Sequence, residues 1–208
     1  AINGATGQLT VADGNLLNYE SAASHTVTVR VTDSGGQSYD ETFTINLTNV
    51  NEGPTDLSLS ANSVAENATT GTVVGMVTST DPDAGDTKTY SLTNTAGGRF
   101  AINASTGVIT VADGSLLNYE AAPSHTVTVR VTDSGGQSYD ETFTINLTNV
   151  NEGPTDLALS ANSVAENATT GTVVGTVSGT DPDASDTKTY SLTDTAGGRF
   201  AIDSATGQ

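Results

Sequence analysis

The chain has 208 residues, with 24 acidic side chains against 6 Lys and Arg and a formal net charge of −18. A chain this acidic repels nucleic acid and anionic lipid, and we therefore expect neither as a partner. Its natural small ligands are cations. There is no Cys for a disulfide or a thiolate metal site, and no apolar run is long enough to span a membrane.

The sequence repeats every 100 residues, because the run ESAASHTVTVRVTDSGGQSYDETFTINLTNVNEGPTDL begins at Glu20 and returns at Glu120. The second copy differs only at Ala121 and Pro123. A unit of this length is too long for a solenoid repeat and has the size of a whole domain. We place the boundaries at the NVNEGPT linkers. Residues 53–152 are then one complete domain, residues 1–52 the C-terminal half of a preceding domain, and residues 153–208 the N-terminal half of the next.

The predicted strands of the complete domain follow one another in short runs. GTVVGMVTS (71–79), TKTYSLT (87–93) and GVITVADG (107–114) are rich in Val, Thr and Tyr. HTVTVRVTD (125–133) and ETFTINLTN (141–149) alternate strictly between apolar and polar residues. Such alternation of β-branched residues is typical of half-buried strands.

The alternation also predicts which side chains are buried. Val127, Val129 and Val131 share one face of the first alternating strand, and Phe143, Ile145 and Leu147 share one face of the second. The segments DPDAGD, NTAGG, NASTG and DSGG supply turns between the strands. About seven short strands in each 100 residues predict an all-β chain of tandem antiparallel β-sandwiches.

Acidic and amide side chains gather at predicted strand ends and turns, and strand ends of a sandwich meet at its two poles. In the complete domain they are Glu66, Asp81, Asp83, Glu120, Asp133, Asn149, Asn151 and Glu152. Clustered carboxylates raise each other's pKa, whereas a calcium ion accepts roughly six to eight oxygens from carboxylates, amides and backbone carbonyls. For DPDAGD alone, a plain polar turn is an equally good interpretation, because Asp favours turns.

Six motifs occur in a fixed order along the chain: AEN, DPD, RFAINASTGVITVAD, LNYE, VRVTDSGG and TNVNEGP. This order resembles the cadherin repeat in its bacterial form, with FAINASTGVI (100–109) as the most specific piece. The resemblance implies cadherin-like, immunoglobulin-like Greek-key sandwiches of about seven strands. It also implies calcium at the linker between successive repeats.

The same resemblance implies one ligand set at each linker. The first set is Glu20, Asn49, Glu52, Asp81, Asp83 and Asp133, with a backbone oxygen near Asn51. The second set is Glu66, Glu120, Asn149, Glu152, Asp181 and Asp183, with Asn151 as the counterpart of Asn51. The amides at 49 and 149 replace an Asp of the family pattern, which predicts weaker binding or fewer ions. Asp86 and Asp186 have no clear role in that pattern.

Three functions are compatible with these features, and none is enzymatic, because no Ser/His/Asp set, His-rich site or phosphate loop is evident. The first is a calcium-stiffened spacer of a secreted bacterial surface adhesin, in cell adhesion or biofilm, with neighbouring repeats as partners. The second is an extracellular filament subunit, in which half-domains of identical chains exchange to give a head-to-tail homopolymer. The third is a carbohydrate-binding cadherin-like module, for which no aromatic platform is evident.

Overall fold

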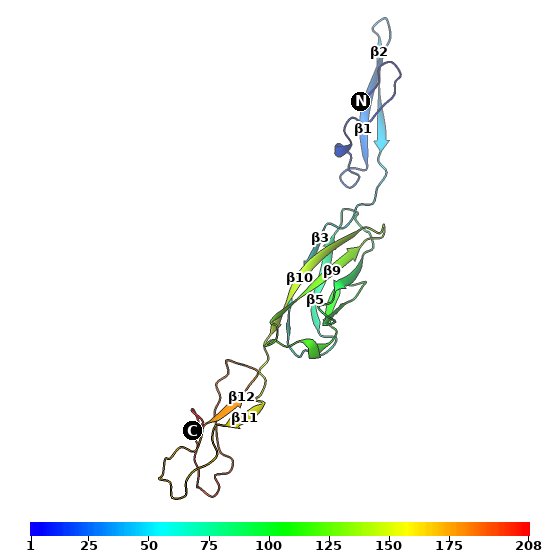
Figure 1. Cartoon of the computed structure of the whole chain (residues 1–208). Helices are drawn as coiled ribbons and strands as arrows, with labels where there is room; N and C mark the ends of the chain where they lie inside the picture. Colours follow the sequence, from blue (N-terminus) through cyan, green and yellow to red (C-terminus); the bar gives the residue numbers. More distant parts are fainter. The chain divides into compact units, whose positions relative to one another are not determined.

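The computed structural model describes residues 1–208 as a chain of strands with two single-turn 3-10 helices, which confirms the all-β prediction (Figure 1). The elements are η1 (Gly14–Leu16), β1 (Ser24–Thr32), β2 (Ser38–Asn46), β3 (Asp56–Leu59), β4 (Ser63–Ala65), β5 (Val73–Thr80), β6 (Thr89–Asn94), β7 (Phe100–Ile102), β8 (Val108–Val111), η2 (Gly114–Leu116), β9 (Ser124–Thr132), β10 (Ser138–Thr148), β11 (Asp156–Leu159) and β12 (Val177–Thr180). None of its helices has the length and apolar character needed to cross a bilayer.

The strands β3 to β10 form a β-sandwich of two four-stranded sheets, ordered β3-β5-β8-β7 and β4-β10-β9-β6 (Figure 1). Eight strands form where about seven were predicted, because the first stretch breaks into β3 and β4, which belong to different sheets. The pairing is antiparallel as predicted except at one ladder, where β4 runs parallel to β10, with Ser63 opposite Asn146.

The switch between sheets has a local cause at residues 60–62. The Ser60 N–H still donates to the Met76 carbonyl of β5 at 3.0 Å. Two residues later the Asn62 side-chain amide donates to the Thr144 carbonyl of β10 at 3.0 Å. Gly75 allows this passage, because a Cβ at that position would overlap the Ala61 carbonyl oxygen.

The alternating runs become the long strands β9 and β10, and their apolar faces are buried as predicted. Val127, Val129 and Val131 are fully buried, and so is Ile145. Phe143 on the same face as Ile145 is only half-buried. The run 107–114 gives a shorter strand than predicted, because β8 ends at Val111 and the chain turns into η2.

The chain divides into two compact units. The first consists of residues 1–62, 69–113 and 126–145, and its core includes Val77, Phe100 and Ile109. The second consists of residues 63–68, 114–125 and 146–208, in which Leu117 and Leu147 are buried. The repeat boundaries at residues 52/53 and 152/153 stay a prediction.

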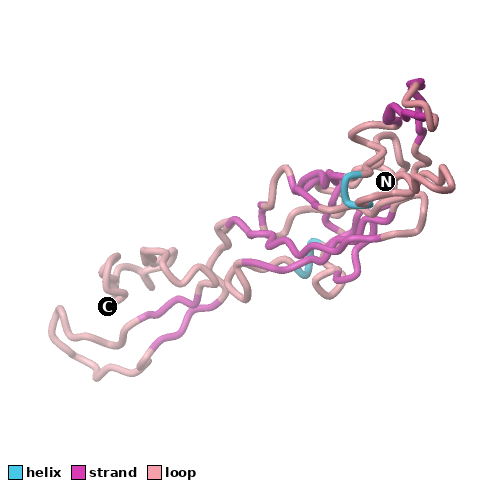
Figure 2. The backbone as a smooth tube through the Cα atoms, turned by 90° about the horizontal axis from the view of Figure 1, so that it is seen from above, coloured by secondary structure: helices cyan, strands magenta, loops and turns pink.

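Residues 1–52 and 153–208 contain fewer strands than the central repeat. The hairpin β1–β2 has the register Ser24 opposite Asn46 and Thr32 opposite Ser38. Residues 153–208 contain only the antiparallel pair β11–β12, and Figure 2 shows the rest of this segment as loops.

Candidate metal centre

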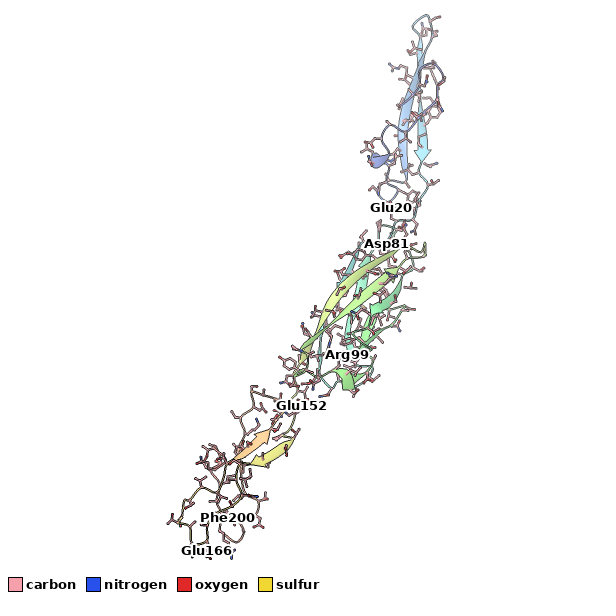
Figure 3. The ribbon with its side chains drawn as sticks, viewed as in Figure 1. Glu20, Asp81, Arg99, Glu152, Glu166 and Phe200 are labelled. Atoms are coloured by element: carbon pink, nitrogen blue, oxygen red, sulfur yellow. The ribbon has the colours of Figure 1, made fainter.

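Six carboxylates gather around the segment that joins β2 to β3. They form two groups of three, with one oxygen from each residue within 4.8 Å of the others: Glu20, Glu52 and Asp83, then Asp81, Asp86 and Asp133. Glu20 and Asp81 can be followed in Figure 3 at the two sides of this segment. The structure therefore brings together all the carboxylates predicted for the first linker and adds Asp86.

Strand ends position these carboxylates. Asp81 and Asp83 follow the last residue of β5, and Asp133 follows the last residue of β9. The Asp83 N–H donates to Asp81 Oδ1 at 3.0 Å, which folds the DPD segment into a tight turn. Asp133 Oδ1 accepts the N–H of Gln137 at 2.8 Å, which fixes its side chain at the start of the next turn.

The linker amides donate to these carboxylates. Asn49 Nδ2 donates to Asp83 Oδ1 at 2.7 Å, and the Glu52 N–H donates to Asp83 Oδ2 at 2.7 Å. Asn51 Nδ2 donates to Asp133 Oδ2 at 2.9 Å, and this bond lowers the pKa of Asp133 below its ordinary value. The side chain of Asn51 thus holds Asp133, and a role of its backbone oxygen stays a prediction.

Several carboxylate oxygens of the first linker are buried without any hydrogen-bond partner. They are Glu52 Oε2, Asp81 Oδ2 and Asp86 Oδ2. No Lys or Arg pairs with them, since Arg30 and Arg130 form their ion pairs with Asp40 and Asp140 on the hairpins. Burying charged oxygens without partners is unfavourable, so this donor set fits a hard cation with oxygen ligands.

The first linker also shows the electrostatic strain of carboxylates close together. Burial raises the pKa of Glu52 above its ordinary value, and the nearby charges of Glu20 and Asp83 raise it further. A divalent cation beside Glu52 would favour the ionised carboxylate instead, so protons and a cation compete for this site.

The second linker also gathers six carboxylates, around the segment between β10 and β11, but they group differently, because Asp183 joins Asp181 and Asp186. Its two groups of three carboxylates are Glu66, Glu120 and Glu152, then Asp181, Asp183 and Asp186. Figure 3 labels Glu152 just before the segment 153–208, and Glu166 at the far end of that segment in space. All the carboxylates predicted for this linker are again brought together, and Asp186 joins them.

Glu66 is the most buried of these carboxylates, with 1% of its surface exposed. Its two oxygens accept the N–H groups of Tyr119 at 2.7 Å and Val150 at 2.8 Å. It therefore ties the LNYE segment to the linker. Burial raises the pKa of Glu120, and the charges of Glu66 and Glu152 add to the rise.

The contacts that the second linker makes to Asp183 match those that the first makes to Asp83. Asn149 Nδ2 and the Glu152 N–H donate to the two oxygens of Asp183, each at 2.7 Å. The Asn149 bond is the main reason that the pKa of Asp183 lies below its ordinary value. Glu152 Oε1 accepts from Asn67 Nδ2 at 3.0 Å, while its Oε2 is buried without a partner. Asn151 donates to the Glu152 carbonyl at 2.9 Å.

The structure adds two kinds of residue to the predicted sets. Asp86 and Asp186 belong to the carboxylate groups, and their sequence signal was the third acidic position of DPDAGDT and DPDASDT. Gln137 and Asn67 hold linker groups by hydrogen bonds, with Gln137 Nε2 donating to the Asn51 carbonyl at 2.7 Å. A lone polar residue in a turn gives no sequence signal for such a contact.

Comparisons with known proteins indicate that the chain is cadherin-like. Residues 61–148 match the family model described as the cadherin domain. Human Cadherin-related family member 2 is 34% identical over 73% of the chain, and mouse Protocadherin Fat 2 is 32% identical over 97% of it. The chain spans only 12% and 5% of the length of these two relatives.

Solved structures agree on the fold. Mouse Cadherin-23 EC22-24 aligns with a TM-score of 0.69 and 26% identity, covering 92% of the chain and 64% of that structure. Protocadherin Gamma B2 extracellular cadherin domains 3-6 align with a TM-score of 0.74 and 23% identity, covering 100% of the chain and 52% of that structure. The fold is therefore cadherin-like. These relatives support the predicted resemblance in general and not its bacterial form.

Proposed function

We propose that the two linkers are calcium sites which stiffen a string of cadherin-like repeats outside the cell. The observation that carries this proposal is the set of buried, unpartnered carboxylate oxygens in both linkers: Glu52 Oε2, Asp81 Oδ2, Asp86 Oδ2 and Glu152 Oε2. Calcium, when bound, supplies the positive charge and accepts the many oxygen ligands that these carboxylates otherwise lack. The match to the cadherin domain supports the same conclusion.

The proposed ligands of the first linker come from three parts of the chain. Glu20 precedes β1, Asn49 and Glu52 belong to the linker with the Asn51 backbone, and Asp81, Asp83 and Asp133 follow β5 and β9. Without a cation these carboxylates repel one another, and the linker amides hold the geometry alone. Side chains that share one cation cannot move independently, so the linker changes from a hinge to a fixed joint.

The second linker works in the same way with Glu66 and Glu120 before the linker, Asn149, Asn151 and Glu152 within it, and Asp181 and Asp183 after it. Its Asn149 and Glu152 contacts to Asp183 repeat those of Asn49 and Glu52 to Asp83 in the first linker. A chain of such joints is a stiff spacer whose length grows with the number of repeats. The near-identity of the copies at Glu20 and Glu120 supports selection for length.

Thermal melting of the chelator-stripped chain tests this proposal, with millimolar calcium in one arm and magnesium in the other. Each site that binds only the folded state adds about 2.7 kcal/mol when free calcium is about 100 times its Kd. We expect a calcium-specific rise in Tm together with a longer maximum dimension in small-angle scattering. A Tm that calcium leaves unchanged would show that the carboxylates are solvated turn residues.

We also infer that the repeats belong to a secreted adhesin on a bacterial surface, acting in adhesion or biofilm. Support comes from the bacterial form of the six motifs and from the extracellular cadherin domains among the solved structures. Antibody labelling of intact cells with and without surface proteolysis tests the location. The filament and carbohydrate functions stay predictions: concentration-dependent growth in size-exclusion chromatography would favour the first, and retention on polysaccharide the second.

A further inference from the structure

The strand β3 lies at the edge of the sheet β3-β5-β8-β7 and pairs with β5 alone. The backbone groups on the outer side of an edge strand can pair with a strand of another molecule, which makes such an edge a starting point for aggregation. In β3 the N–H of Leu57 does not go unused, because it donates to a side chain of β10, Glu141 Oε2, at 3.1 Å. This edge is therefore partly covered from within the same repeat.

Glu141 is an exception to the alternation that builds β10. It lies on the same side of the strand as Phe143 and Ile145, which are half-buried and buried. Glu141 is itself half-buried, and no Lys or Arg forms an ion pair with it. An apolar residue would continue this face of the strand, so packing does not explain the carboxylate. Inward-pointing charged residues are, however, one device by which β-proteins block pairing at their edges.

The preceding repeat shows what the same side chain does without an edge strand beside it. The residues around Glu41 are identical to those around Glu141, but the hairpin β1–β2 pairs with no further strand. There Glu41 Oε2 accepts the hydroxyl of Tyr39, on its own strand, at 2.6 Å. In the central repeat the same oxygen accepts the Leu57 N–H. The presence of β3, and not the local sequence, thus directs Glu141 to the edge.

A second strand at this edge would have to displace Glu141. It would take over the Leu57 N–H and cover a carboxylate that has lost its hydrogen bond and has no ion-pair partner. Burying a charge in this way is unfavourable. The repeats are near-identical, and tandem linkage brings copies of the same edge together at high local concentration. A chain of this kind therefore needs protection at its edges.

We propose that Glu141 guards the outer edge of β3 against strand addition by a second copy of this chain. The contact between Leu57 and Glu141 lies within the sandwich and includes none of the proposed calcium ligands. Glu141 therefore acts in the same way whether or not the linkers bind calcium.

A fluorescent label on β3 tests this role, because the chain has no Cys of its own. Ser58→Cys carries a pyrene label at an exposed position of β3. When two such strands pair edge to edge, opposite and diagonal side chains lie about 4.5–8 Å apart, so the two pyrenes meet and emit as an excimer. The labelled 208-residue chain is compared with Glu141→Val and with Thr144→Val. Thr144→Val is the matched control, because it adds the same Val to the exposed face of β10 and leaves Glu141 in place.

We expect excimer emission from Glu141→Val to rise several-fold as the protein concentration increases, with little emission from the other two chains. Emission from Glu141→Val as weak as that of the unchanged chain overturns the role of Glu141. Strong emission from the unchanged chain would show that the edge is open, and strong emission from Thr144→Val would show that any added Val causes association. Either result also overturns the proposal.

Circular dichroism shows whether Glu141→Val keeps its β structure. If it does not, Glu141→Ala takes its place, because it removes the carboxylate and adds no bulk to the core. A several-fold rise in excimer emission from Glu141→Ala supports the guarding role, and emission equal to that of the unchanged chain overturns it.

Discussion

Asn49→Asp is the substitution whose effect should change sign with calcium. In the structure, Asn49 Nδ2 donates to Asp83 Oδ1 at 2.7 Å. The substitution removes this donor and places a seventh carboxylate beside the six of the first linker. A hydrogen bond to a charged group contributes roughly 1.5–3 kcal/mol, and the new like-charge repulsion acts in the same direction.

Without calcium we therefore expect Asn49→Asp to lose about 2 kcal/mol of stability or somewhat more. For a domain of roughly 60–100 residues this lowers Tm by about 8–16 °C. With excess calcium the added carboxylate becomes a ligand, and the Kd should fall by about tenfold. The rise in Tm on adding calcium should thus be larger for the variant than for the unchanged chain.

Differential scanning calorimetry in chelator and in millimolar calcium measures both effects. Asn94→Asp is the matched control, because it adds one negative charge to the same repeat at a position where the next repeat already has Asp194. If Asn49→Asp melts like Asn94→Asp in chelator, the Asn49–Asp83 bond is not a stabilising contact. If calcium affinity does not increase, position 49 is not in the cation site.

Three further predictions follow from the same contacts. Glu66→Ala should lower the free energy of unfolding by about 2–4 kcal/mol in chemical denaturation, because it leaves the Tyr119 and Val150 N–H groups without their acceptor. Glu166→Ala, at the exposed counterpart, should change that free energy by no more than about 0.5 kcal/mol. Equal losses in the two variants would refute the role of the buried contacts. In chelator, stability should rise as the pH falls from 7 toward the ordinary glutamate range. The raised pKa values of Glu52 and Glu120 mean that the folded state binds more protons in this range than the unfolded state. Below the range the trend should reverse, because Asp133 and Asp183, whose pKa values are lowered, become protonated. The increase in stability on adding calcium should instead shrink as the pH falls, since protons compete with calcium for the ligands. An increase that does not change with pH between 7 and the glutamate range would contradict this competition. Gly135→Ala should weaken calcium binding, because the added Cβ overlaps the Asn51 side chain that holds Asp133. In the equivalent turn before the linker, the Cβ added by Gly35→Ala meets only Asp33, so this variant should bind calcium like the unchanged chain. The same affinity in both variants would exclude Asn51 from the site.

The sequence by itself determined the repeat and the all-β class, and it named most of the carboxylates that the structure brings together. Alternation at Val127, Val129 and Val131 has one physical cause, a half-buried strand, so it could be predicted without tertiary information. The motif order also assigned Glu20 and Asp81 to one linker, and Glu66 and Asp181 to the next, although these residues lie far apart in the chain. These ligand sets stay predictions, and the structure places the two members of each pair in neighbouring carboxylate groups.

Only the tertiary structure decided which atoms lack a partner. Nothing in DPDAGDT distinguishes Asp81, whose Oδ1 caps the turn, from Asp86, which accepts no hydrogen bond. The end of β9 also brings an oxygen of Asp133 within 4.8 Å of oxygens from both residues, and the printed sequence contains no trace of that contact. The parallel pairing of β4 with β10 was missed for the same reason, since a three-residue strand gains its partner from the sheet that it joins and not from its own residues.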